Sequence, residues 1–210
     1  YPVIWGWDGA IPIPVFPDIN RPPSTASVSF WNSDTNLIVA LGDSITYGFN
    51  LPHYSNTFVA SLASLLHKTV VNEGVSGEPS RLGLARSASV LSWYKPGTLI
   101  ILFGANDIQY AYDIGETVSN LRDIIQTARI NNTVPLICTL TPVADEHRDM
   151  APAVRALNRE IRLLAQTENV TLVDFESALG WNSASLLSDG LHPNSAGHQA
   201  MADLLYQLLK

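Results

Sequence analysis

The sequence predicts an α/β fold in which a parallel sheet of about five strands lies between layers of helices. From Leu37 to the C-terminus, short apolar runs alternate with segments of helical periodicity. The apolar runs are continuous, which is typical of strands buried on both faces. Strand–helix alternation of this kind gives parallel strands joined by right-handed crossovers. We therefore expect a three-layer α/β/α sandwich with the flavodoxin-like strand order 2-1-3-4-5, which gathers functional groups beyond the carboxyl ends of the strands.

Each predicted strand is a run of apolar residues, and each predicted helix carries apolar residues at intervals of three and four. The predicted strands are Leu37–Leu41, Thr69–Asn72, Thr98–Phe103, Val134–Leu140 and Val170–Asp174. The predicted helices are Tyr54–Leu66, Ser80–Trp93, Val118–Ala128, Val154–Leu164 and Ala200–Leu208.

Residues 1–36 do not follow this pattern, because they are rich in proline and hold three tryptophans. We interpret them as an extended arm whose aromatic side chains pack on the domain, or as a linker to an upstream domain missing from this chain. An aromatic surface that contacts sugars is the alternative. Residues 37–210 are expected to form the one folded domain.

Composition excludes several classes of protein. A net charge of -7 without a basic stretch argues against nucleic acid as a partner. No apolar run approaches the roughly 20 residues that span a bilayer. Cys138 is the only cysteine, which excludes an intramolecular disulfide and a cysteine zinc site, and histidine spacing predicts no metal. We expect Cys138 to be a buried, unreactive thiol.

Three residues at two distant places supply the groups of nucleophilic acyl chemistry. Ser44 follows the first predicted strand in the segment Gly-Asp-Ser-Ile, and Asp189 and His192 lie three residues apart ahead of the last helix. An alcohol, an imidazole that takes its proton and a carboxylate that orients the imidazole form a catalytic triad. A serine after a strand can also be a helix cap, and a histidine ahead of a helix can be a surface residue. The pairing of both segments favours the catalytic interpretation.

Two further segments could stabilise the negative charge of a tetrahedral intermediate. Gly77 lies in a glycine-containing turn after the second predicted strand, where backbone N–H groups can approach a substrate. Asn106 follows the third strand and carries a side-chain amide. Each segment alone is an ordinary turn, but the proposed sheet brings both to the same edge as Ser44.

With these four segments in order, the chain resembles an SGNH hydrolase of the GDSL-type esterase and lipase superfamily, from about Leu37 to the C-terminus. The resemblance implies a flavodoxin-like fold, Ser44 as nucleophile, and Asp189 and His192 as the rest of the triad. It also implies an oxyanion hole formed by the N–H groups of Ser44 and Gly77 and the amide of Asn106. No cofactor is implied.

Other polar residues receive structural interpretations. Asp43 and Asp107 are expected to brace loops by accepting hydrogen bonds from backbone N–H groups. The histidines in or beside helices are expected to be structural or at the surface: His53, His67 and His198. Arg81 and Arg86 could meet an anionic substrate, but ion pairs are the favoured interpretation.

The substrate is predicted less sharply. Six residues are expected to line the pocket: Tyr47, Ile108, Gln109, Tyr110, Pro142 and Val143. No long apolar lid is evident, which favours short acyl groups, above all acetyl on a carbohydrate or another small ester. A thioesterase or lysophospholipase and an acyltransferase with the same triad are alternatives, as are a flavodoxin-like or sugar-binding module without activity. We expect a processed protein or a trimmed piece of a longer one, from a protein that is secreted or located in the cell envelope.

Overall fold

The centre of the protein is one five-stranded parallel sheet with the order β2-β1-β3-β4-β5. The structure, a computed structural model, describes residues 33–181 and 186–210. The strands are β1 (Asp34–Gly42), β2 (Thr69–Gly74), β3 (Pro96–Leu102), β4 (Val134–Cys138) and β5 (Thr171–Val173). The predicted fold class and strand order are confirmed. Most of the predicted arm, residues 1–36, lies outside the described residues.

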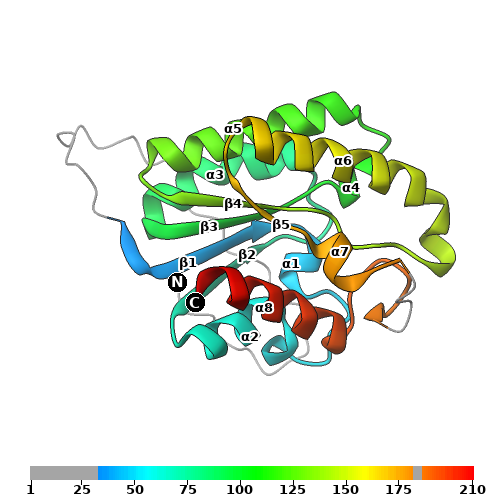
Figure 1. The fold of residues 1–210 in the computed structure, drawn as a ribbon, viewed down its shortest axis with the longest axis horizontal. Coiled ribbons are helices and arrows are strands. Elements are labelled where there is room, and N and C mark those ends of the chain that lie inside the picture. The colour runs from blue at the N-terminus through cyan, green and yellow to red at the C-terminus, as the bar shows by residue number, and fades with distance from the viewer. Residues whose placement is uncertain (1–32, 182–185) are drawn as a thin grey trace, which may run out of the picture. The chain divides into compact units, whose positions relative to one another are not determined.

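Long helices cover both faces of the sheet (Figure 1). One face is covered by α3 (Ser80–Tyr94), α5 (Ile114–Ile130) and α6 (Ala151–Thr167), with α5 packed between the other two. The other face is covered by α2 (Phe58–Leu66) and α8 (Ser195–Leu209), which pack against each other. The sheet is thus the middle layer of three.

Short helices follow three of the strands. α1 (Ser44–Tyr47), α4 (Ala105–Gln109) and α7 (Phe175–Leu179) begin within three residues of the carboxyl ends of β1, β3 and β5. Two 3₁₀ helices, η1 (Tyr54–Asn56) and η2 (Asp145–Met150), precede α2 and α6. Sequence periodicity does not predict these elements, because one helical turn contains no repeat.

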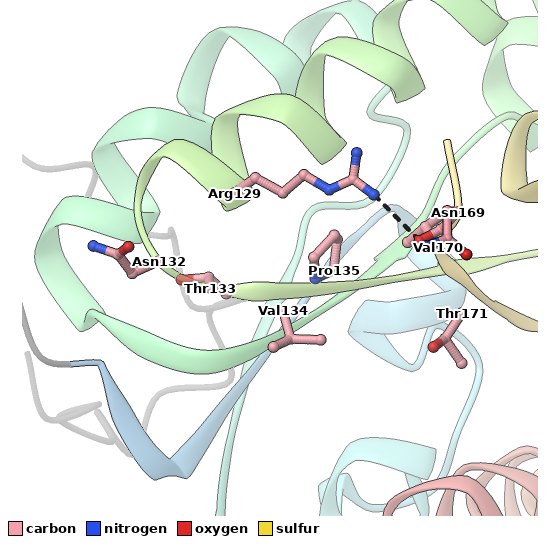
Figure 2. A pocket seen from close by; sticks show the side chains of 8 residues that line it. All are labelled: Arg129, Asn132, Thr133, Val134, Pro135, Asn169, Val170 and Thr171. Carbon is pink, nitrogen blue, oxygen red and sulfur yellow. Dashed lines mark hydrogen bonds between the residues drawn. The ribbon is translucent and has the colours of Figure 1, made fainter. Parts of the chain in front are cut away.

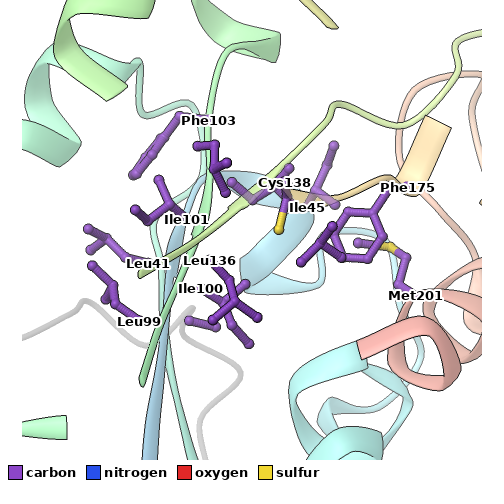
Figure 3. Packing of buried hydrophobic residues seen from close by; sticks show 14 of the residues in the cluster. Leu41, Ile45, Leu99, Ile100, Ile101, Phe103, Leu136, Cys138, Phe175 and Met201 are labelled. Carbon is purple, nitrogen blue, oxygen red and sulfur yellow. The ribbon is translucent and has the colours of Figure 1, made fainter. Parts of the chain in front are cut away.

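The hydrophobic core lies on both faces of the sheet, as the continuous apolar runs predict. In β3, Leu99 and Ile101 point toward one face and Ile100 toward the other, where Phe175 and Met201 lie (Figure 3). All five side chains are fully buried. The two packed faces hold the strands rigidly and therefore fix the loops at their carboxyl ends.

Most strand boundaries differ by one to three residues from the predicted ones, and two of these differences have a clear physical reason. β4 ends at Cys138 instead of Leu140, because the backbone N–H and carbonyl of Leu140 pair with the side chain of Asn158, at 2.7 and 3.1 Å, instead of with a neighbouring strand. β3 begins at Pro96, two residues early, since a proline is tolerated as the first residue of a strand.

Candidate active site

Ser44 is the first residue of α1 and lies two residues after Gly42, the last residue of β1, at the carboxyl edge of the sheet. Asp43 caps this helix, because its Oδ1 accepts a hydrogen bond from the backbone N–H of Ile45 at 2.9 Å. α1 lies so close to β2 that a Cβ on Gly74 would collide with the backbone of Tyr47. The glycine therefore allows the turn that holds Ser44 in place, with 8% of the residue exposed.

Ser44, His192 and Asp189 form one hydrogen-bonded chain. The Oγ of Ser44 lies 2.9 Å from Nε2 of His192, and Nδ1 of His192 lies 2.7 Å from Oδ2 of Asp189. Because a carboxylate only accepts, Nδ1 carries the proton and Nε2 is left to accept from the serine hydroxyl. Partial burial would raise the pKa of Asp189, but hydrogen bonds from the backbone and ring of His192 and from the Leu191 N–H lower it to about 2. Asp189 is thus held as a carboxylate.

The loop that carries His192 is anchored at several points. Leu187 and Pro193 form an antiparallel bridge at its two ends. Gly190 has a left-handed backbone with φ 82, and its carbonyl accepts from the N–H of Ala144 at 2.7 Å. The loop is thereby fixed to the segment that follows β4. These contacts anchor the chain on both sides of His192 and so hold its imidazole in place.

Asn106 lies in the first turn of α4 and is 6% exposed. Its Nδ2 lies 3.2 Å from the carbonyl of Glu78 and 3.4 Å from Oδ2 of Asp43. The longer of these contacts is weak. Asn106 therefore joins the segments that follow β1, β2 and β3, and its amide lies next to the residue that precedes Ser44.

Gly77 lies in the turn that connects β2 to α3 and has a left-handed backbone, with φ 77. Its carbonyl accepts a hydrogen bond from the hydroxyl of Tyr110 at 3.3 Å. The next residue, Glu78, is the one whose carbonyl contacts Asn106. The turn predicted to supply a backbone donor thus lies beside the predicted amide donor.

Two buried aspartates brace this region, as the sequence predicts. Asp107 accepts from the N–H of Ser80 at 2.9 Å, and also from the hydroxyls of Ser80 and Thr117. Burial, together with the nearby charges of Asp107 and Glu78, raises the pKa of Asp43 to about 7, although the hydrogen bond from the N–H of Ile45 lowers it. The site therefore concentrates carboxyl groups below its surface.

Arg86 balances part of this negative charge. Its guanidinium pairs with Glu78 at 2.6 Å and Glu73 at 3.0 Å, and it also donates to the backbone carbonyl of Glu73. Arg81 donates to the hydroxyl of Tyr112 at 3.2 Å. The interpretation of Arg86 as an ion-pair residue is confirmed.

Three exposed aromatic side chains come from segments next to Ser44. Tyr47 is 42% exposed, Phe49 43% and Tyr110 50%. The ring of Phe49 lies against that of His192, with centroids 4.8 Å apart. We call Tyr47, Phe49 and Tyr110 the aromatic rim. Gln109, which precedes Tyr110, is also exposed.

The remaining residues predicted to line a pocket are less accessible. Ile108 packs against the hydrophobic core, and Val143 belongs to it with 5% exposed. Pro142 is buried as well. A role of these three residues in substrate binding stays a prediction.

Asn50 is a site residue that sequence reasoning missed. Its Nδ2 donates to Oδ2 of Asp189 at 2.8 Å. The residues lie 139 positions apart, and nothing in the local pattern around Asn50 marks it as more than a turn residue.

The other histidines and the cysteine have structural positions. His198 is fully buried, its Nδ1 accepts from the N–H of Phe58 at 3.1 Å, and burial lowers its pKa to about 4. His53 precedes η1 and His67 ends α2. Cys138 is buried, which raises the pKa of its thiol. The expectation that Cys138 is buried is confirmed, and its lack of reactivity stays a prediction.

Among residues 33–181 and 186–210, no group of three or more histidine, cysteine or acidic side chains could hold a metal ion. The same part of the chain contains no helix that is long and apolar enough to cross a membrane.

Figure 2 shows a hollow at the amino-terminal ends of β4 and β5, the opposite end of the sheet from Ser44. Its lining residues are Arg129, Asn132, Thr133, Val134, Pro135, Asn169, Val170 and Thr171. Arg129 donates across it to the backbone carbonyl of Asn169 at 3.3 Å. None of the triad or oxyanion-hole candidates lies there.

Comparison with known proteins gives relatives of similar length. The chain is 28% identical over 185 residues to thioesterase 1/protease 1/lysophospholipase L1 of Escherichia coli, covering 85% of this chain and 84% of that protein. It is also 28% identical over 201 residues to an acetylxylan esterase of Geobacillus stearothermophilus, covering 79% and 90%. The fold resembles that of a member of the lipolytic protein G-D-S-L family from Veillonella parvula, with a TM-score of 0.73, 21% identity, and coverage of 82% and 97%.

The GDSL-like Lipase/Acylhydrolase family matches residues 40–200. This stretch contains all four segments that carry the resemblance in the sequence. The chain therefore belongs to this family, and the enzyme class predicted from sequence, a carboxylic ester hydrolase, is confirmed.

Proposed function

We propose that this member of the GDSL-like lipase/acylhydrolase family hydrolyses short-chain esters, above all acetyl esters on a carbohydrate, through a covalent acyl-enzyme. The observation that carries the proposal is the unbroken chain from the Ser44 hydroxyl through His192 to the Asp189 carboxylate, with contacts of 2.9 and 2.7 Å. Both distances lie in the range that proton transfer requires.

In the first half of the reaction, Oγ of Ser44 attacks the ester carbonyl carbon while Nε2 of His192 takes its proton. The carboxylate of Asp189 stabilises the imidazolium that forms. The tetrahedral intermediate then collapses, the bond to the leaving alcohol breaks, and His192 returns the proton to that alcohol. The acyl group remains on Ser44.

In the second half, His192 takes a proton from water, and the resulting hydroxide attacks the acyl-enzyme. The intermediate collapses, Ser44 recovers its proton from His192, and the carboxylic acid leaves. In both halves the developing oxyanion is proposed to accept from the N–H groups of Ser44 and Gly77 and from the amide of Asn106. The weak 3.4 Å contact of that amide with Asp43 is one that an oxyanion can replace.

Two features favour a neutral carbohydrate ester. The aromatic rim offers exposed rings at the edge of the site, and such rings stack on the apolar faces of sugars. The chain has a net charge of -7, and the buried carboxyl group of Asp107 lies beneath the site. This charge disfavours substrates that carry phosphate groups, and the acetylxylan esterase relative supports an acetylated sugar.

A thioesterase or lysophospholipase is the second candidate, supported by the Escherichia coli relative, which is as similar in sequence. A panel of acetylated xylo-oligosaccharides, aryl esters of increasing chain length, acyl thioesters and lysophospholipids distinguishes the two. We expect kcat/KM to be highest for acetyl esters and to fall with chain length. Higher kcat/KM for long-chain esters or thioesters would overturn the carbohydrate proposal.

The triad is tested by Ser44→Ala with a short-chain aryl ester. We expect kcat to fall by at least about 10⁴-fold, and labelling by a fluorophosphonate probe to disappear, with the melting temperature unchanged. Normal turnover by the folded variant would sink the assignment. The family membership favours this enzyme over a sugar-binding or flavodoxin-like module, and labelling of the wild-type serine separates them directly.

An acyltransferase would use the same acyl-enzyme, with an acceptor alcohol in place of water. Product analysis with and without an added sugar acceptor distinguishes the two activities. We expect free acid as the main product in both cases, and an acylated acceptor as the main product would show a transferase.

A further inference from the structure

We propose that Asn50 is a positioning residue for the triad, which acts by holding Asp189 in the orientation that His192 requires. This inference rests on the proposed function of the triad. Nδ2 of Asn50 donates to Oδ2 of Asp189 at 2.8 Å, and the same oxygen accepts from Nδ1 of His192 at 2.7 Å. The amide and the imidazole therefore share one acceptor atom.

The other hydrogen bonds to Asp189 come from its own loop. Its Oδ1 accepts from the N–H groups of Leu191 and His192, at 3.0 and 2.8 Å. Among residues 33–181 and 186–210, Asn50 is the one residue outside this loop that donates a hydrogen bond to the carboxylate. The side chain of Asp189 is 32% exposed, so Oδ2 has water as an alternative partner. A protein donor at this position holds the carboxylate more rigidly than exchanging water does.

The backbone conformation after α1 places the Asn50 amide next to Asp189. Gly48 and Phe49 both donate their N–H to the carbonyl of Ser44, at 3.0 Å each, which ends α1 and turns the chain back. Asn50 then has a left-handed backbone with φ 63, a conformation that asparagine tolerates better than most residues.

The neighbouring side chain contacts the same group. The ring of Phe49 lies against the imidazole of His192 at 4.8 Å, while Asn50 holds Asp189. The turn after the nucleophile thus contacts both other members of the triad. This gives the two halves of the site a second connection besides the Ser44–His192 hydrogen bond.

This connection has a specific use in the reaction. His192 becomes positively charged in each half-reaction, and its hydrogen bond to Asp189 must remain aligned as the charge appears. A fixed carboxylate needs no reorientation at that moment. Loss of the Asn50 amide is therefore expected to lower kcat and to leave KM almost unchanged.

The test uses two substitutions at Asn50. Asn50→Gly keeps the left-handed backbone, which glycine adopts freely, and removes only the side chain. We expect kcat on the acetyl ester to fall by about 10-fold, since a hydrogen bond to a charged group is lost. Asn50→Asp keeps the shape and places a second negative charge beside Asp189, so it should stabilise the imidazolium of His192. In this variant the acid limb of the kcat/KM profile is expected to move to higher pH.

Other titratable groups lie near Asp189 and His192. They are present in every variant, so their effect on the pH profile is the same in each and does not alter the comparison. They are Asp43 beside Ser44, Asp145 beside the His192 loop, and His198 on α8. Burial and the charge of His192 lower the pKa of His198 to about 4, so His198 stays neutral over most of the profile.

Asn132→Gly is the matched control. Asn132 is another exposed asparagine with a left-handed backbone, φ 56, and it lies at the opposite end of the sheet. We expect this variant to keep the wild-type kcat and pH profile. A spectroscopic readout independent of turnover is the low-field NMR signal of the His192 Nδ1 proton, which Asn50→Gly should shift and Asn132→Gly should not.

The outcomes separate this inference from the proposed function. If Asn50→Gly keeps the wild-type kcat and proton signal and Asn50→Asp keeps the wild-type pH profile, the positioning role is wrong while the triad stands. If wild-type protein does not react with a fluorophosphonate, the proposed function fails. A melting temperature close to wild type in Asn50→Gly shows that lost activity does not come from unfolding.

Discussion

The two ends of the sheet hold polar groups in different ways. At the carboxyl end, Asp43 and Asp107 are almost fully buried, and every carboxylate oxygen accepts a hydrogen bond: Oδ1 of Asp43 from its own helix, and the other three oxygens from other segments. At the amino end, Arg129 and Glu168 form a partly exposed pair, with side chains 36% and 18% exposed, beside an open hollow. One end has oriented, buried groups, and the other has accessible space.

This difference teaches that a hollow does not by itself identify an active site. Polar groups are buried only when other groups satisfy them. Their convergence at the carboxyl end, from segments as far apart as Ser44 and His192, therefore marks the end where chemistry is supported. The ion pair of Arg129 with Glu168 at the amino-terminal end is partly solvated, and such pairs contribute little.

A matched pair of substitutions, one at each end of the sheet, tests most directly whether the two ends differ. Asn106→Ala removes the proposed amide donor, and we expect kcat to fall by about 10²–10³-fold with little change in KM. Arg129→Ala at the other end should leave kcat unchanged and lower the free energy of unfolding by less than about 1 kcal/mol. Steady-state kinetics and denaturant unfolding measure both effects. Equal losses of activity in the two variants would show that the ends do not differ.

The second prediction concerns stability at the carboxyl end. The side chain of Glu78 is only 7% exposed in its pair with Arg86. Arg86→Ala therefore leaves a buried carboxylate without its cation. We expect the free energy of unfolding to fall by about 3 kcal/mol, several times more than for Arg129→Ala. Urea unfolding at neutral pH gives the comparison. A loss as small as that of the Arg129 variant would mean that the Arg86 pair is as solvated as the Arg129–Glu168 pair.

The third prediction concerns a pH dependence that comes from Asp43. Burial raises its folded-state pKa from 3.8 to about 7. The folded protein then holds this proton more tightly than the unfolded chain, so its stabilising contribution is complete below about pH 4 and is lost as the pH rises through about 7.

Asp43→Asn removes this dependence. We expect its melting temperature, relative to wild type, to be higher at pH 8 than at pH 5. The same variant should lose activity, because an amide facing Asn106 repels its Nδ2 across the present 3.4 Å contact. Melting curves at both pH values test the idea, and an identical difference at each would refute it.

The sequence predicts most of the fold because its strands are unambiguous. A run such as Thr98–Phe103 is too short for a helix and too apolar for a loop, and similar runs recur between amphipathic helices. The strand boundaries were less predictable. The end of β4 depends on Asn158, a residue of α6 that pairs with the backbone of Leu140. Such a contact leaves no local pattern.

The candidate site was predictable where residue type and order carry the chemistry, as for Ser44, Asp189 and His192. The structure brings these three together. Asn50 could not be found in this way, since its contact with Asp189 depends on how α1 ends. The raised pKa of Asp43 was equally hidden, because it follows from burial and not from sequence.

The separation of Ser44 from His192 by 148 positions has a consequence for synthesis on the ribosome. Ser44 emerges early, but its base emerges only with the segment before α8. α8 then docks onto α2, where His198 accepts from the N–H of Phe58. In the proposed mechanism, a nascent chain therefore carries an unactivated serine, and acyl transfer to it can begin only after the C-terminal segment has folded.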